Sequence, residues 1–86
     1  GIFMEKLVDA LQLPKDLMLG ALNIQLLGRY EAYVENYKSI IEYNDKVISL
    51  LGKKSKVTIS GENLRIVCFS KDDMRIKGCL YEIKFE

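Results

Sequence analysis

The sequence has no histidine and no tryptophan, and its 86 residues include only one proline and two cysteines. Without histidine, the chain lacks the side chain whose unperturbed pKa lies nearest neutrality, which excludes catalytic triads built on an imidazole base. Cys68 and Cys79 are too few for the disulfide framework of a small secreted domain, and their spacing matches no four-ligand zinc pattern. We therefore expect no catalytic residue, no metal site and no cofactor, and a reducing compartment.

Excess charge and long apolar runs are also missing. Thirteen Lys and Arg residues against twelve Asp and Glu residues give a net charge of +1, whereas a domain that neutralises nucleic-acid phosphates is usually strongly basic. No apolar run approaches the ~20 residues that span a bilayer, so we expect an untargeted, soluble chain. Its length predicts a single domain, residues 1–86, that is too small for a deep active site and uses its surface.

Residues 3–12 have the periodicity of an amphipathic helix. Phe3, Leu7, Ala10 and Leu11 fall at i, i+4, i+7 and i+8, and the polar positions of the segment are Glu5, Lys6, Asp9 and Gln12. Pro14 cannot continue a helix, so residues 1–22 are expected to form a helical segment followed by a linker. The apolar face of this helix either covers the sheet that follows or docks on another protein or a membrane, with Phe3, Leu7 and Leu11 as the contact residues.

From residue 23 to residue 86 the apolar residues alternate, which is the pattern of β-strands. A shift of seventeen residues places the unit at 57–68 on the unit at 74–85, so that apolar residues fall on apolar residues and Gly61 falls on Gly78. A unit at 41–52 matches with a shift of sixteen residues, and a weaker unit begins at Ile24. The β-rich region therefore contains four related units of about seventeen residues.

Each unit consists of two alternating runs with a residue between them that tolerates tight-turn geometry. These residues are Gly28, Asp45, Gly61 and Gly78. The pattern predicts a mostly β chain of about eight short strands. Short polar connectors favour an antiparallel meander folded into a sandwich or barrel, and a short β-solenoid with one unit per coil is the alternative.

Two further features are candidate sites. Lysines cluster at Lys53, Lys54 and Lys56, and four tyrosines precede them at Tyr30, Tyr33, Tyr37 and Tyr43. Aromatic side chains beside a basic groove can stack nucleic-acid bases, although the near-neutral charge counts against this use. Cys68 follows Leu64 and Ile66 at alternate positions and is therefore expected to point into the core with them. Cys79 lies beside Gly78, and the sequence allows it to be either buried or exposed.

Four segments in order carry a resemblance to a known family. They are Leu13–Asp16, Gly28–Tyr37 leading into Ile41–Tyr43, Ile59–Ile66 with I-x-G-x-N-L, and Ile76–Phe85 with I-x-G-x-x-x-x-I-x-F. Together they span nearly the whole chain from about residue 7. In this ordered set the chain resembles the YabP/YqfC family of sporulation proteins, and its YqfC branch in particular.

The resemblance implies a protein of the mother-cell cytoplasm, or of the periphery of the membrane around the forespore, that acts during endospore formation without known enzymatic activity. It also implies a link to a membrane protein of the YqfD type or to the spore coat. We expect a non-enzymatic assembly or interaction module that forms a homo-oligomer or docks on such a partner, with no small-molecule substrate. The alternative is a binding domain for nucleic acid or an anionic envelope polymer, which would use Lys53, Lys54 and Lys56.

Overall fold

The computed structural model describes residues 20–86, so the helix expected at residues 3–12 lies outside the described part. This part forms one antiparallel sheet of six strands in the order β1-β2-β6-β5-β4-β3. The strands are β1 Asn23–Leu27, β2 Glu31–Glu35, β3 Ser39–Tyr43, β4 Val47–Leu51, β5 Lys56–Phe69 and β6 Asp73–Phe85. The mostly β class and the antiparallel pairing are confirmed. The solenoid alternative is wrong for these residues, because a solenoid needs parallel stacking of its coils.

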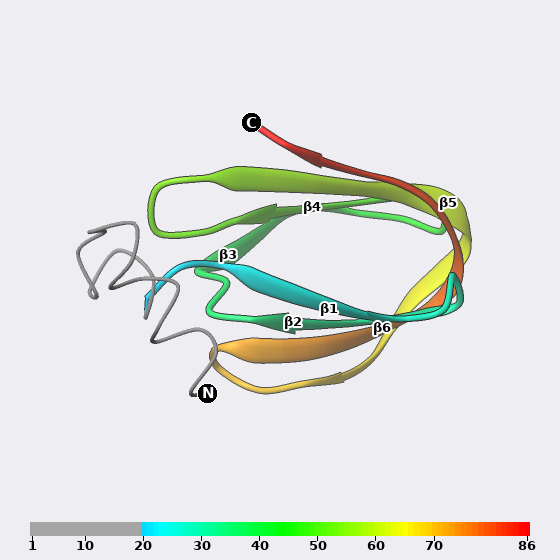
Figure 1. Ribbon diagram of the computed structural model, residues 1–86, viewed down its shortest axis with the longest axis horizontal. Coiled ribbons are helices and arrows are strands. Elements are labelled where there is room, and N and C mark those ends of the chain that lie inside the picture. The colour runs from blue at the N-terminus through cyan, green and yellow to red at the C-terminus, as the bar shows by residue number, and fades with distance from the viewer. Residues whose placement is uncertain (1–19) are drawn as a thin grey trace, which may run out of the picture.

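Two long strands bend and fold the sheet over itself. β5 and β6 have 14 and 13 residues, whereas each of the other strands has five. Register shifts interrupt the β5–β6 pairing between Ser60 and Gly61 and between Glu62 and Arg65, and such bulges bend a strand and increase its twist. One half of the sheet, with β3 and β4, therefore lies over the other half, with β1 and β2 (Figure 1).

Inward-facing side chains from both halves form the core. In β2, Ala32 and Val34 are fully buried and pair with Ile76 and Met74 of β6. The first half of β5 alternates in the same way, so the period of two seen in the sequence is a true inside–outside pattern there. In β4, Ile48 and Leu50 are buried, and Ser49 between them is buried as well. The buried apolar residues are Leu22, Ala32, Val34, Tyr37, Ile48, Leu50, Val57, Ile59, Leu64, Met74, Ile76 and Leu80.

Gly61 and Gly78 lie inside β5 and β6 at the bend, and the prediction that they form turns between separate strands is wrong. For this reason the described part has six strands instead of about eight. A Cβ atom on Gly61 would lie 2.0 Å from the carbonyl oxygen of Cys79, and one on Gly78 would lie 2.7 Å from that of Asn63. The two glycines let β5 and β6 approach each other where they bend, whereas Gly28, with φ of 61°, does lie in the β1–β2 turn.

The tips of the β1–β2 and β3–β4 hairpins lie against this bend and hydrogen-bond to it. The bonds run from Gly61 N to Lys46 O at 2.9 Å, from Leu64 N to Asp45 O at 2.8 Å, from Gly78 N to Tyr30 O at 3.1 Å and from Leu80 N to Arg29 O at 2.7 Å. Gly61 and Gly78 directly follow Ser60 and Lys77, where the β4–β5 and β2–β6 pairings end, so these bonds extend the pairing of each hairpin onto the bend. The four glycine and aspartate positions of the sequence repeat meet at this end of the molecule.

Candidate interaction edges

Each half of the folded sheet ends in two strand edges that pair with no other strand of residues 20–86. In one half the edges are β3 and the end of β6 at residues 82–85, and in the other they are β1 and the end of β5 at residues 65–69. Unpaired edges present rows of backbone N–H and C=O groups to which another strand can bind. These four segments are called the β3, β6, β1 and β5 edges below.

Large apolar side chains are exposed along all four edges. Phe69 of the β5 edge is 71% exposed, although it pairs with the buried Met74, and Phe85 of the β6 edge is 57% exposed opposite the buried Val57. The inner face of the sheet therefore extends beyond the area that the opposite half covers. The other exposed apolar residues on these edges are Leu26 and Leu27 in β1, Ile40, Ile41 and Tyr43 in β3, and Val67 in β5.

The β3 and β5 edges are irregular and partly tied to each other. Their pairing registers shift at Ile41 in β3 and at Val67 in β5. The backbone N–H of Ile66 donates to the hydroxyl oxygen of Tyr43 at 2.9 Å, which joins the two edges near the bend. Bulges of this kind make an edge a poorer template for an added strand.

The bulge at Val67 also overturns the expectation for Cys68. Because Val67 is an extra residue, Ile66 pairs with Ile76 but Cys68 pairs with Arg75, on the outer face. Cys68 is therefore exposed and does not fill the core, Cys79 is half-buried, and no disulfide joins the two thiols.

The lysine cluster lies at the end of the molecule opposite the bend. Lys53 and Lys54 are exposed in the β4–β5 turn, whereas Lys56 forms an ion pair with Glu86 at 3.6 Å. A pocket of about 220 Å³ lies beside the turn. Its lining residues are Ala21, Leu22, Lys53, Lys54 and Ser55.

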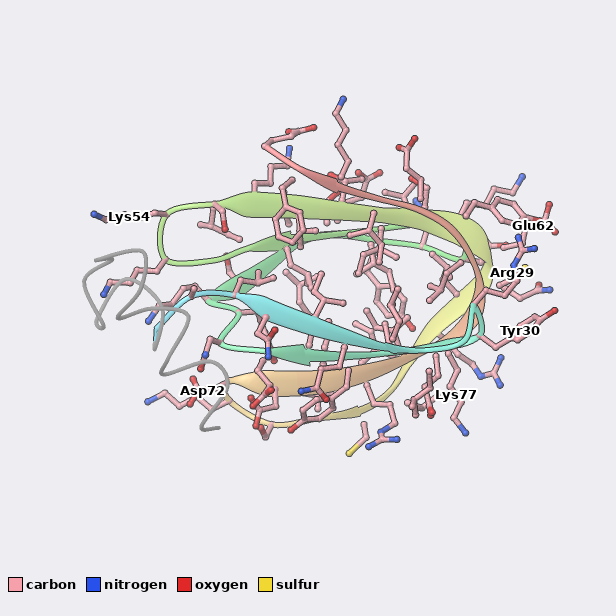
Figure 2. All side chains as sticks on the ribbon, viewed as in Figure 1. Arg29, Tyr30, Lys54, Glu62, Asp72 and Lys77 are labelled. Carbon is pink, nitrogen blue, oxygen red and sulfur yellow. The ribbon has the colours of Figure 1, made fainter. Side chains whose placement is uncertain are left out.

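The tyrosines do not gather beside these lysines, so residues 20–86 do not form the aromatic platform that a stacking site for nucleic-acid bases would need. Tyr30 and Lys54 lie at opposite ends of the molecule (Figure 2). Tyr37 is buried and its hydroxyl donates to the carbonyl oxygen of Ser70 at 2.7 Å. Tyr33 lies on the outer face of β2, under the guanidinium group of Arg75 at 5.6 Å from the ring centre.

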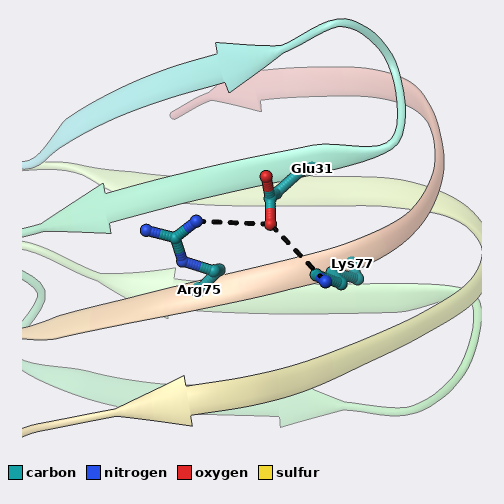
Figure 3. A network of polar contacts seen from close by, with 3 residues as sticks. All are labelled: Glu31, Arg75 and Lys77. Atoms are coloured by element: carbon teal, nitrogen blue, oxygen red, sulfur yellow. Dashed lines mark hydrogen bonds and ion pairs between the residues drawn. The ribbon is translucent and has the colours of Figure 1, made fainter.

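On the outer face of β2 and β6, charged side chains pair with one another. Glu31 Oε1 lies 3.3 Å from Arg75 Nη1 and 3.9 Å from Lys77 Nζ (Figure 3). Partial loss of solvent raises the pKa of Tyr33, and the nearby Asp73 carboxylate raises it further. Cross-strand pairs of this kind stabilise a solvent-facing sheet surface modestly. This face therefore gives no reason to expect a ligand.

Metal sites and membrane-spanning helices are two other kinds of functional feature. Within residues 20–86, no group of three or more His, Cys, Asp or Glu side chains is placed to hold a metal ion. The same residues contain no helix long and apolar enough to cross a membrane. The contact residues expected on the N-terminal helix, Phe3, Leu7 and Leu11, lie outside the described residues. The four edges are thus the surface features that stand out in this part of the chain.

Comparison with known proteins places the bent sheet in a family. The sequence profile of the YabP family matches residues 19–86, which include all six strands. The chain belongs to the YabP family. It is also similar to a Bacillus subtilis (strain 168) protein named "Uncharacterized protein YqfC", with 25% identity over 79 residues that cover 92% of this chain and 85% of that protein. The YabP/YqfC family is associated with sporulation. No solved structure matches the chain.

Proposed function

We propose that this chain acts in endospore formation as a non-enzymatic interaction module whose strand edges bind other protein strands. The observation that carries this proposal is the exposure of inner-face side chains such as Phe69 and Phe85 beside a buried core. An added strand would cover these side chains and pair with the unpaired backbone groups at the same time. Exposed apolar patches next to a core are typical of protein–protein contact surfaces.

The partner is a second copy of the chain, a membrane-associated sporulation protein of the YqfD type, or both. The place of action is the mother cell, in its cytoplasm or at the membrane around the forespore. Family membership supports this setting, and the edges supply a means of binding that requires no catalytic residue and no cofactor.

The test changes exposed apolar edge residues to lysine. Each variant gene replaces the chromosomal gene in the source bacterium. Leu27→Lys and Phe69→Lys alter the β1 and β5 edges at side chains that are 62% and 71% exposed, so the fold should tolerate them. Tyr30→Lys is the matched control, because Tyr30 is 64% exposed but lies in a hairpin tip rather than on an edge. We expect fewer heat-resistant spores with the edge variants at equal protein level, and normal numbers with the control. Normal sporulation of both edge variants would contradict the proposal.

Binding of an anionic polymer is the second candidate function. It is favoured by the two exposed lysines of one turn, Lys53 and Lys54, for which residues 20–86 provide no ion pair. If this function is correct, binding of single-stranded DNA or an anionic envelope polymer should weaken steeply as salt rises, and a variant with glutamine at both lysines should lose it. Binding that is absent, or that ignores both salt and the substitutions, would rule it out.

A further inference from the structure

The β6 edge is the edge best formed to pair with a copy of itself. Its register with β5 is continuous from Ser60–Glu82 to Val57–Phe85, whereas the β3 and β5 edges contain shifts. The β1 edge is also regular, but its sequence Asn-Ile-Gln-Leu-Leu has no charge that could select one register. The β6 edge carries two opposite charges, Glu82 and Lys84, between apolar residues.

The backbone of this edge is oriented for pairing. Lys56 and Glu86 exchange two hydrogen bonds, with N···O distances of 3.1 and 2.7 Å, and so form a hydrogen-bonded pair of the antiparallel ladder. Hydrogen-bonded and non-hydrogen-bonded pairs alternate along such a ladder. Phe85 and Ile83 therefore belong to non-hydrogen-bonded pairs with β5, and their N–H and C=O groups point away from β5 toward the unpaired side.

We propose that a second copy of the chain pairs with this edge in antiparallel direction, about a two-fold axis through Ile83. This inference rests on the proposed function and names its partner and its surface. In this register Ile83 faces Ile83 of the second copy and Glu82 faces Lys84. The interface contains the Glu82–Lys84 pair twice, because a two-fold axis makes it self-complementary.

Charge selects this register over its neighbours. Glu82 and Lys84 pair with Ser60 and Thr58 of β5 and so share the outer face, while Ile83 and Phe85 share the inner face. Centring the pairing on Glu82 would place two glutamates opposite each other, and centring it on Lys84 would place two lysines opposite each other. Like charges directly across a strand pair are destabilising. A shift by a single residue would instead exchange the inner and outer faces.

The inner face supplies the apolar part of the contact. Phe85 is 57% exposed and Ile83 is half-buried, so pairing would extend the core of one copy into that of the other. A strand pair of this length buries less than the roughly 1,200–2,000 Å² of a standard interface. The association is therefore expected in the micromolar range rather than the nanomolar range.

A charge-exchange experiment on the full chain tests this arrangement. Glu82→Lys places two lysines on the outer face of the edge, and Lys84→Glu places two glutamates there, so each variant repels a copy of itself. An equimolar mixture of the two restores both ion pairs, as does the double variant E82K/K84E. Asp72→Lys is the matched control, because it changes the charge by the same amount at an exposed residue of the β5–β6 turn that lies on none of the four edges.

Sedimentation velocity from micromolar to near-millimolar concentration measures the association of each protein. Circular dichroism shows that each variant is folded. We expect dimers of the wild type and of the control, at least tenfold weaker association of each single variant alone, and recovery in the mixture. Wild-type dimers that the single variants leave unchanged would overturn the β6 pairing, as would a monomeric wild type. The sporulation test on the β1 and β5 edges does not depend on this pairing, so it can still support or refute the proposed function.

Discussion

Replacing Gly61 by alanine should break the bend on which the folded sheet depends. The added Cβ would lie 2.0 Å from Cys79 O and 3.0 Å from the Cδ2 atom of Leu64. Non-bonded atoms attract each other at about 3.5 Å, so β5 and β6 would have to separate by roughly 1.5 Å. Overpacking usually costs about 1–3 kcal/mol, and we expect at least the upper end because the clashing oxygen belongs to the backbone and cannot rotate away.

This loss is large for so small a chain. At roughly 0.05–0.15 kcal/mol per residue, the whole domain is stable by only about 4–13 kcal/mol. A displacement of Gly61 would also disturb its 2.9 Å hydrogen bond from Gly61 N to Lys46 O. We therefore expect Gly61→Ala to be strongly destabilised or unfolded at 25 °C.

Gly28→Ala is the matched control for this prediction. A Cβ on Gly28 would meet nothing within 4 Å, and only the φ of +61° disfavours it, at a cost of about 1–2 kcal/mol. The assay is urea unfolding followed by far-ultraviolet circular dichroism, with the free energy of unfolding extrapolated to water. Equal free energies for the two alanine variants would show that the strands at the bend separate easily, and would refute the steric argument.

Three further predictions concern the core and the thiols. Tyr37→Phe removes the 2.7 Å hydrogen bond to the Ser70 carbonyl and should lower the free energy of unfolding by about 0.5–1.5 kcal/mol in urea titrations; an unchanged value would mean that water replaces the hydroxyl. Ile76→Ala empties a fully buried site and should cost about 2–5 kcal/mol in the same titration, and a cost below 1 kcal/mol would contradict the assigned core. Because Cys68 and Cys79 form no disulfide, added reductant should leave the thermal midpoint unchanged, and a marked decrease would contradict this.

The periodicity of the sequence predicted the local structure well. Alternation in segments such as Glu31–Glu35 marks true inside–outside strands, and the short polar connectors lie between strands as expected. The repeat also found Gly61 and Gly78. Its interpretation failed because a glycine in a turn and a glycine at a close strand approach both reverse the alternation, and only the three-dimensional structure distinguishes them.

The interaction edges were harder to predict from the sequence. Whether a strand lies at an edge depends on the order of the strands in the sheet and not on the strand's own residues. Nothing in the residues Ser39–Tyr43 says that β3 lies at the end of the sheet formed by residues 20–86, where all five are exposed. The bulge at Val67 changes which face Cys68 occupies, and parity counting cannot detect it. Likewise, Tyr30 and Lys54 are close enough in sequence to suggest one surface, but the strands carry them to opposite ends.

The bend that builds the core also creates two of the edges. The first half of β5 lies between β4 and β6, but beyond the bend β5 pairs with β6 alone. The first half of β6 lies between β2 and β5, and beyond the bend it too becomes an edge. Each long strand thus changes from a central strand to an edge strand near its glycine, at Gly61 or Gly78. A variant at either glycine would disturb folding and assembly together, whereas Glu82 and Lys84 lie beyond the bend on the outer face, so their exchange tests assembly while the core stays intact.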